Sequence, residues 1–200
     1  GNQGGASVGY NPHKKGAKSY HPLLLFVSNI KCVVNTWFRP GSAYTSNGIV
    51  EFLKQSSSYL NKAEHVLFRA DSGFFSGPLL DWLEGQHWHY LIKAKFKGLK
   101  ELLADQQWMP ADDHAGFWVC DFSHQCKKWK KPRQFKAVRW VDSYVQKTFF
   151  DQLQWVPVYK YACYCINQDM DAWAAHECYK QRSTSENWIG QTGQAETQPT

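Results

Sequence analysis

The sequence predicts an α/β fold in which helices pack on a mixed sheet, and three observations support it. Hydrophobic residues make up 43% of the 200 residues, which is enough to build a core. Residues 1–97 carry strand and helix patterns in the order strand, strand, helix, strand, helix, strand. Residues 98–158 differ, because their Trp- and Lys-rich alternating stretches predict a β-rich insertion.

The first two strands follow a loop-like segment, residues 1–20, that is rich in Gly, Asn, Lys and Ser. Apolar stretches at 21–27 and 31–38 are separated by Ser28, which with its neighbour Asn29 can turn the chain. We expect an antiparallel pair.

A first helix is expected from a cap at Ser46 or Asn47 to about Leu60, and a short strand follows at 63–69. This strand ends just before Asp71.

A second helix begins at the capping residue Ser76, has Pro78 in its first turn and has Gly85 past its end. The aromatic and β-branched stretch 88–95 predicts another strand, and a short helix follows at 99–104.

The remaining chain predicts strands and then a helix. Asn167 and its neighbours are expected to cap a final helix over about 170–189. The expected strands are 116–122, 135–141, 147–155 and 159–166. The predicted organisation is a first core part (1–97), an insertion (98–158), a last core part (159–190) and a disordered tail (191–200).

Composition narrows the function classes. The net charge of +6 favours a polyanionic partner such as nucleic acid over an acidic ligand. Six scattered cysteines without a CxxC pair indicate a reduced, cytoplasmic protein. The longest apolar run, at 23–27, is too short to cross a membrane.

Asp71, in the segment RADSGFF, is the first candidate for chemistry. An acid that follows a strand lies at the mouth of an α/β sheet, where its carboxylate can bind a hard cation such as Mg²⁺. The other interpretation is an Asp that only caps the following turn.

The final helix carries a second candidate group. Tyr179, Arg182 and Glu186 are spaced three and four apart, so they share one helix face. They are either a solvated stripe or a carboxylate and a cation that together face a metal-bound phosphate.

Basic residues form two further groups. Five cations surround Trp129, an arrangement that suits a DNA backbone with one stacked base, although an exposed hairpin tip explains it equally well. These five cations are Lys127, Lys128, Lys130, Lys131 and Arg133. A second basic run, with Lys93 and Lys95 on one strand face, lies beside the Asp71 strand.

Four segments, read in order, resemble bacterial insertion-sequence transposases with an RNase H-like catalytic core, in particular the group numbered thirteen-eighty. They are GNQGGASVGYNPHKKGAKSYHPLLLF, RPGSAYTSNGIVEFL, FRADSGFF and YKQRSTSEN, and the resemblance spans residues 1–189. Tyr179, Arg182 and Glu186 also fit the superfamily pattern of Tyr, two residues, Arg, three residues and Glu.

The resemblance implies an RNase H-like mixed sheet flanked by helices, with three carboxylates that hold two Mg²⁺ (or Mn²⁺) ions for DNA cleavage and strand transfer. By this match Asp71 is the second acid and Glu186 the third, while Tyr179 and Arg182 position phosphate. The first acid is expected upstream of Gly1, so the chain is expected to be a fragment with little activity by itself.

The implied partner is double-stranded DNA, both transposon ends and target, with a homodimer as one arrangement in the complex and no membrane. The insertion would contact the transposon end. Two other interpretations stay open: a non-catalytic DNA-binding module or decayed remnant, and a plain RNase H-like nuclease.

Overall fold

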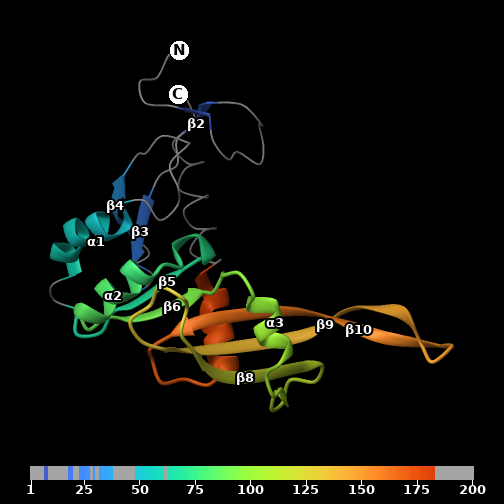
Figure 1. Ribbon diagram of the computed structural model, residues 1–200. Helices are drawn as coiled ribbons and strands as arrows, with labels where there is room; N and C mark the ends of the chain where they lie inside the picture. The colour runs from blue at the N-terminus through green and yellow to red at the C-terminus, as the bar shows by residue number, and fades with distance from the viewer. Residues whose placement is uncertain are drawn as a thin grey trace, which may run out of the picture.

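The computed structural model describes residues 7–8, 18–19, 23–27, 29, 32–37, 48–60 and 63–182 (Figure 1). Within them, the main sheet has six strands in the order β5–β6–β10–β9–β8–β7. β5 runs parallel to β6, and the other neighbouring strands are antiparallel. The strands are β5 (Leu67–Ala70), β6 (His89–Lys93), β7 (Met109–Pro110), β8 (Phe117–His124), β9 (Arg133–Phe149) and β10 (Gln152–Ile166).

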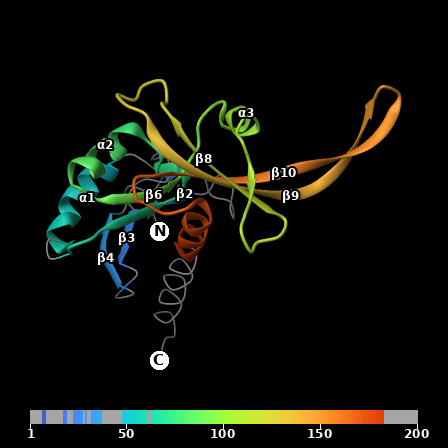
Figure 2. The ribbon, with the colours of Figure 1, turned by 90° about the horizontal axis from the view of Figure 1, so that it is seen from below.

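Helices cover both faces of this sheet (Figure 2). One face packs against α1 (Ile49–Ser57), α2 (Gly77–Gly85) and α3 (Leu99–Ala104), and the other packs against a helix that includes residues 172–182. β6 shows the two faces by alternation, since Tyr90 and Ile92 belong to the first cluster and Leu91 to the second. The predicted mixed sheet flanked by helices is therefore present.

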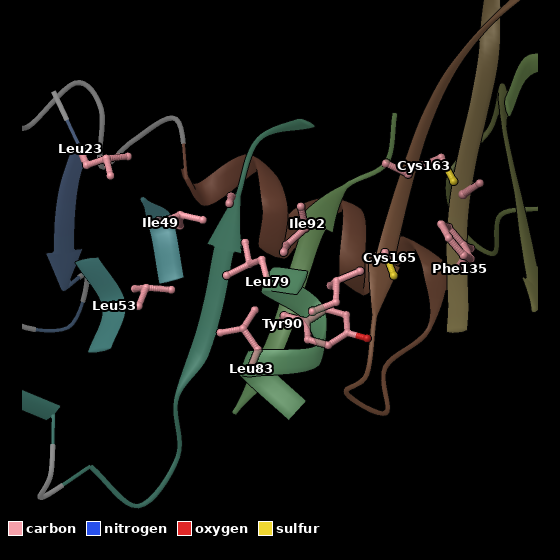
Figure 3. Close-up of a cluster of buried hydrophobic side chains, with 14 of the residues drawn as sticks. Leu23, Ile49, Leu53, Leu79, Leu83, Tyr90, Ile92, Phe135, Cys163 and Cys165 are labelled. Carbon is pink, nitrogen blue, oxygen red and sulfur yellow. The ribbon is translucent and has the colours of Figure 1, made fainter. Parts of the chain in front are cut away.

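The larger core cluster runs from β3 across α1 and α2 to β10 (Figure 3). Leu53, Leu79 and Leu83 have no exposed surface. Complete burial of each leucine contributes about 1.5–3 kcal/mol. This cluster fixes α2 against β6, and it thereby holds the segment between β5 and α2 that contains Asp71.

Two smaller sheets precede α1. β3 (Leu23–Val27) pairs antiparallel with β4 (Cys32–Trp37), as predicted, and β1 (Ser7–Val8) pairs with β2 (Lys18–Ser19). The β3–β4 pair is tied to α1 where Asn35 Nδ2 donates to Ser56 Oγ at 2.8 Å.

The predicted helices are present, with α3 at its predicted bounds. α1 ends in a 3-10 turn, η1 (Ser58–Leu60), and its expected caps Ser46 and Asn47 lie outside the described residues. Gly85 is the last residue of α2 rather than a residue past its end.

The cap predicted for the final helix was wrong. The Asp171 carboxylate accepts the Ala174 N–H at 2.7 Å, so it caps the helix that starts at residue 172. Asn167 instead bonds the β6 strand, where its side chain accepts from the Tyr90 N–H at 2.7 Å and donates to the Trp88 carbonyl at 3.1 Å. The Asn167 side chain therefore binds backbone groups that are distant in sequence, and it does not cap the helix as local sequence predicted.

The strands predicted at 135–141, 147–155 and 159–166 are parts of two continuous strands, β9 and β10. The two strands pair from Gln134–Ile166 out to Phe149–Gln152, with a register shift beside Val158. Residues 98–158 thus share their sheet with the core, and the insertion boundary that we set at 158 falls inside β10.

Beyond β8, the hairpin of residues 141–158 extends away from the body as an arm (Figures 1 and 2). Its side chains are largely exposed, among them Tyr144 (59%), Leu153 (69%) and Trp155 (66%). The turn residues Phe150 and Asp151 both have positive φ, 45° and 61°, which is the pattern of a type I′ turn usually formed by Asn-Gly. No helix of the described part of the chain is long and apolar enough to span a bilayer.

The turn of the arm makes a stability prediction. Asp151→Gly should raise the free energy of unfolding by about 0.5–1 kcal/mol, because glycine adopts positive φ without strain from a Cβ. Chemical denaturation measures this change. The matched control is Asp105→Gly, at φ −85°, where added backbone freedom should destabilise the protein. Equal destabilisation by both substitutions would contradict the left-handed turn.

Candidate active site

Asp71 lies directly after β5, at the end of the sheet where the parallel strands β5 and β6 finish. Its Oδ1 accepts the Gly73 N–H at 2.8 Å, and it caps the 3-10 turn η2 (Ser72–Phe74). The two interpretations of this residue are therefore compatible, because the hydrogen bond that caps the turn also fixes the carboxylate at the sheet edge.

The sheet register places Lys93 beside Asp71. The last matched pair of β5 and β6 is Ala70 with Ile92, so the next residues along both strands, Asp71 and Lys93, are level. Lys93 also pairs with Tyr164 of β10, and paired residues on neighbouring strands point to the same face. Lys93 and Lys95 are both exposed. A carboxylate and cations thus meet at one end of the sheet.

The helix at 172–182 covers the same face. Ala175 is fully buried against β6 and β10, and the rings of Tyr164 and Tyr179 lie 4.8 Å apart. The Tyr164 hydroxyl and His176 Nδ1 are hydrogen-bonded at 2.8 Å. Burial, followed by the nearby Lys180 cation, lowers the pKa of His176 below its usual value. These contacts fix the helix against β10.

A second tie joins this helix to β5. Arg69 Nη1 donates to the Cys178 carbonyl at 2.7 Å. One turn further along, the guanidinium of Arg182 lies 5.4 Å from the centre of the Tyr179 ring. The helix therefore runs beside the strand that ends at Asp71. Glu186, the other predicted metal ligand, lies outside the described residues.

The predicted DNA-binding cluster falls on the loop between β8 and β9, and two of its residues hold that loop in place. Arg133 is 4% exposed and forms ion pairs with Glu84 (2.8 Å) and Asp81 (2.6 Å) of α2. Trp129 lies under the Arg133 guanidinium at 4.6 Å and against Phe75 at 5.5 Å. These contacts anchor the loop against α2 and against Phe75, which lies four residues after Asp71.

The carboxylate of Glu84 is the centre of this anchor. Burial by itself would raise its pKa, but hydrogen bonds from Arg133, Lys131 and Tyr90 outweigh burial and lower the pKa from 4.5 to about 2. The same network raises the pKa of Arg133, against the effect of burial. Both groups are therefore charged near neutral pH.

The other cations of the cluster, Lys127, Lys128, Lys130 and Lys131, are exposed. Lys131 forms an ion pair with Glu84 at 2.9 Å. The structure thus brings Asp71, Lys93, Tyr179 and Arg182 to one face of the sheet and anchors the basic loop beside the segment that follows Asp71.

Sequence reasoning missed Arg69 and His176. Arg69 lies two positions before Asp71, so strand alternation could have placed both on one face. His176 lies three positions before Tyr179 on the same helix, but its hydrogen bond to Tyr164 joins two elements and left no local signal. In the described part of the chain, Asp71 belongs to no group of three or more His, Cys, Asp or Glu residues that could hold a metal ion.

The family model described as "Transposase DDE domain group 1" matches residues 1–197, and the chain belongs to that family. This confirms the predicted DDE-type transposase family.

A solved structure has a similar fold. It is the cryo-EM structure of a piggyBac transposase synaptic complex with hairpin DNA, at a TM-score of 0.54 and 16% sequence identity. The match covers 92% of this chain but 36% of that one, so this chain spans about a third of the solved protein. No curated protein sequence matches this chain. The likeness supports the predicted RNase H-like fold class.

The Glu84 anchor predicts a pH-dependent stability. Glu84→Gln should lower the free energy of unfolding at pH 7 by about 3 kcal/mol, because it leaves the buried Arg133 partly uncompensated. Since folding lowers the pKa of Glu84, its stabilisation is complete above about pH 4.5 and is lost as the pH falls towards about 2.

Urea denaturation of both proteins across this range measures the difference. The exposed Glu101→Gln is the control, and it should change stability little at any pH. A Glu84→Gln deficit that stays constant from pH 7 to pH 2 would contradict the assignment.

Proposed function

We propose that this domain carries the chemistry of a DNA transposase: phosphodiester cleavage and strand transfer at transposon ends by a two-metal mechanism. The observation that carries the proposal is the convergence at one sheet end of Asp71, Lys93 and the helix that includes residues 172–182. Membership of the transposase family supports the same assignment.

The donor chemistry at this sheet end fits a divalent cation. Asp71 offers carboxylate oxygen, the ligand that Mg²⁺ and Mn²⁺ prefer, and its orientation is fixed by Gly73. In the family pattern Asp71 corresponds to the second acid and Glu186 would be the third, and the pattern includes a first acid as well. The chemistry that two such ions supply is activation of the attacking oxygen and stabilisation of charge on the leaving oxygen.

The chain's own residues hold the DNA. Lys93, which is level with Asp71, and Lys95, two residues further along the chain, are exposed and would bind the phosphate next to the scissile bond. Arg182 and Tyr179 would orient the same strand from the helix. The similar piggyBac structure contains hairpin DNA, which supports duplex DNA as the partner here.

Residues 98–158 would act as the insertion that contacts the transposon end. The loop within it offers Lys127, Lys128 and Lys130 to the DNA backbone, while Trp129 and Arg133 hold the loop against α2. The lysines rather than Arg133 would bind the DNA backbone. Arg133 is 4% exposed and forms two ion pairs, so it has little surface left for a phosphate.

Removal of either proposed ligand tests the chemistry. In the transposase that contains this domain, Asp71→Asn and Glu186→Gln should each abolish Mg²⁺-dependent strand cleavage and leave DNA binding nearly intact, because a neutral amide binds the cation poorly. Cleavage of labelled transposon-end duplexes measures the first, and gel-shift titration the second. The exposed Asp105→Asn is the matched control. Cleavage at the control rate by either variant would remove our site assignment.

Salt dependence tests the basic loop. Combined Lys127→Gln, Lys128→Gln and Lys130→Gln should reduce the slope of log K against log salt by up to about 3, roughly 0.9 for each lost phosphate contact. Lys54→Gln, on the exposed side of α1, is the single-charge control. An unchanged slope in the triple variant would mean that these lysines do not contact DNA phosphates and contribute only to solubility.

A further inference from the structure

Arg69 connects two elements that the proposed chemistry needs at a fixed separation. It lies on β5, two residues before Asp71, and its Nη1 donates to the Cys178 carbonyl at 2.7 Å. The two residues are 109 positions apart in sequence. The bond therefore spans the interface between the strand that ends at Asp71 and the helix that includes residues 172–182.

The bond reaches the helix one turn before Arg182. Residues 178 and 182 are four apart, so they lie on one face of the helix in successive turns. Arg69 and Asp71 are likewise two apart on an extended strand and point to one face. The hydrogen bond between Arg69 and the Cys178 carbonyl thus fixes the position of the helix along its own axis relative to Asp71.

Packing against the sheet also holds the helix. Ala175 is fully buried in this contact, and Cys178 and Tyr179 pack partly buried beside it. The Tyr164–His176 hydrogen bond ties it to β10 at one point. A second tie on a different strand, β5, restricts both sliding and rotation. A charged donor makes this tie stronger than a neutral one.

We propose that Arg69 is a positioning residue, which holds the helix that includes residues 172–182 at a fixed position beside Asp71. The inference rests on the proposed function of Asp71 and Glu186. Lysine can donate to one carbonyl but lacks the planar fork of arginine, so Arg69→Lys should preserve the tie in part. Glutamine, which is shorter and neutral, should not.

The test compares Arg69→Gln with Arg69→Lys in the transposase that contains this domain. Arg69→Gln should slow single-turnover cleavage on the order of 100-fold, the cost of a small misplacement of catalytic groups, with DNA affinity unchanged. It should also raise the Mn²⁺ concentration needed for half-saturation, measured by electron paramagnetic resonance without DNA. Arg69→Lys should restore part of both.

Two further measurements separate positioning from general loss of structure. Hydrogen exchange should show faster exchange over residues 172–182 in Arg69→Gln. The control is Arg139→Gln, which removes a half-buried arginine from an aromatic cluster on the opposite sheet face and should leave Mn²⁺ binding unchanged. If Arg69→Gln does not fold, Arg69→Lys still decides: intermediate helix protection and intermediate Mn²⁺ affinity are expected, and wild-type values of both would contradict the proposal.

Failure of this inference differs from failure of the proposed function. If Asp71→Asn is inactive but Arg69→Gln keeps wild-type Mn²⁺ affinity and helix protection, the Arg69 proposal is wrong and the site assignment stands. If Asp71→Asn cleaves DNA and binds Mn²⁺ as the wild type does, the proposed function is wrong and the positioning proposal is overturned with it.

Discussion

The pairing of β6 with β10 is the contact on which the rest of the structure depends. β6 ends the first run of strands and helices, β10 is the last strand of the chain's long hairpin, and their register brings Lys93 beside Tyr164. Beside this pair, Leu91 and Ile92 of β6 are buried on opposite faces of the sheet, as are Tyr164 and Cys165 of β10. Since α2 packs on one face and the last helix on the other, this pairing decides which residues of the two halves meet at the end of β5.

Local patterns in the sequence were enough to predict the short elements. The bounds of α3, the antiparallel β3–β4 pair and the strand before Asp71 follow from apolar spacing and from turn residues. The length of β9 and β10 could not be predicted in this way. Their register is set by pairing across a turn whose first central residue, Phe150, is not a typical turn former. The role of Asn167 was missed because its partners lie on β6.

The candidate site shows the same division between local and long-range information. Asp71 could be identified because a strand, an acid and Ser-Gly stand together in the sequence. The cluster from Lys127 to Arg133 was correctly seen as basic, but no local feature shows that Arg133 is neutralised by α2, 49 residues earlier. The contribution of Arg69 depends on a carbonyl 109 residues away. Such pairs become visible when the sheet register is known.

The described arginines and lysines around the site have different roles, and the chemistry of their side chains explains the difference. Arg133 and Arg69 donate inward, to carboxylates and to a helix carbonyl, where a planar and permanently charged fork can satisfy fixed acceptors. The exposed cations near Asp71 and on the basic loop are lysines, strongly hydrated point charges on flexible stems. Flexible lysines suit phosphates whose positions vary along a duplex, and they carry little sequence information. Fixed arginines therefore shape the proposed site, while mobile lysines would supply affinity for DNA of any sequence.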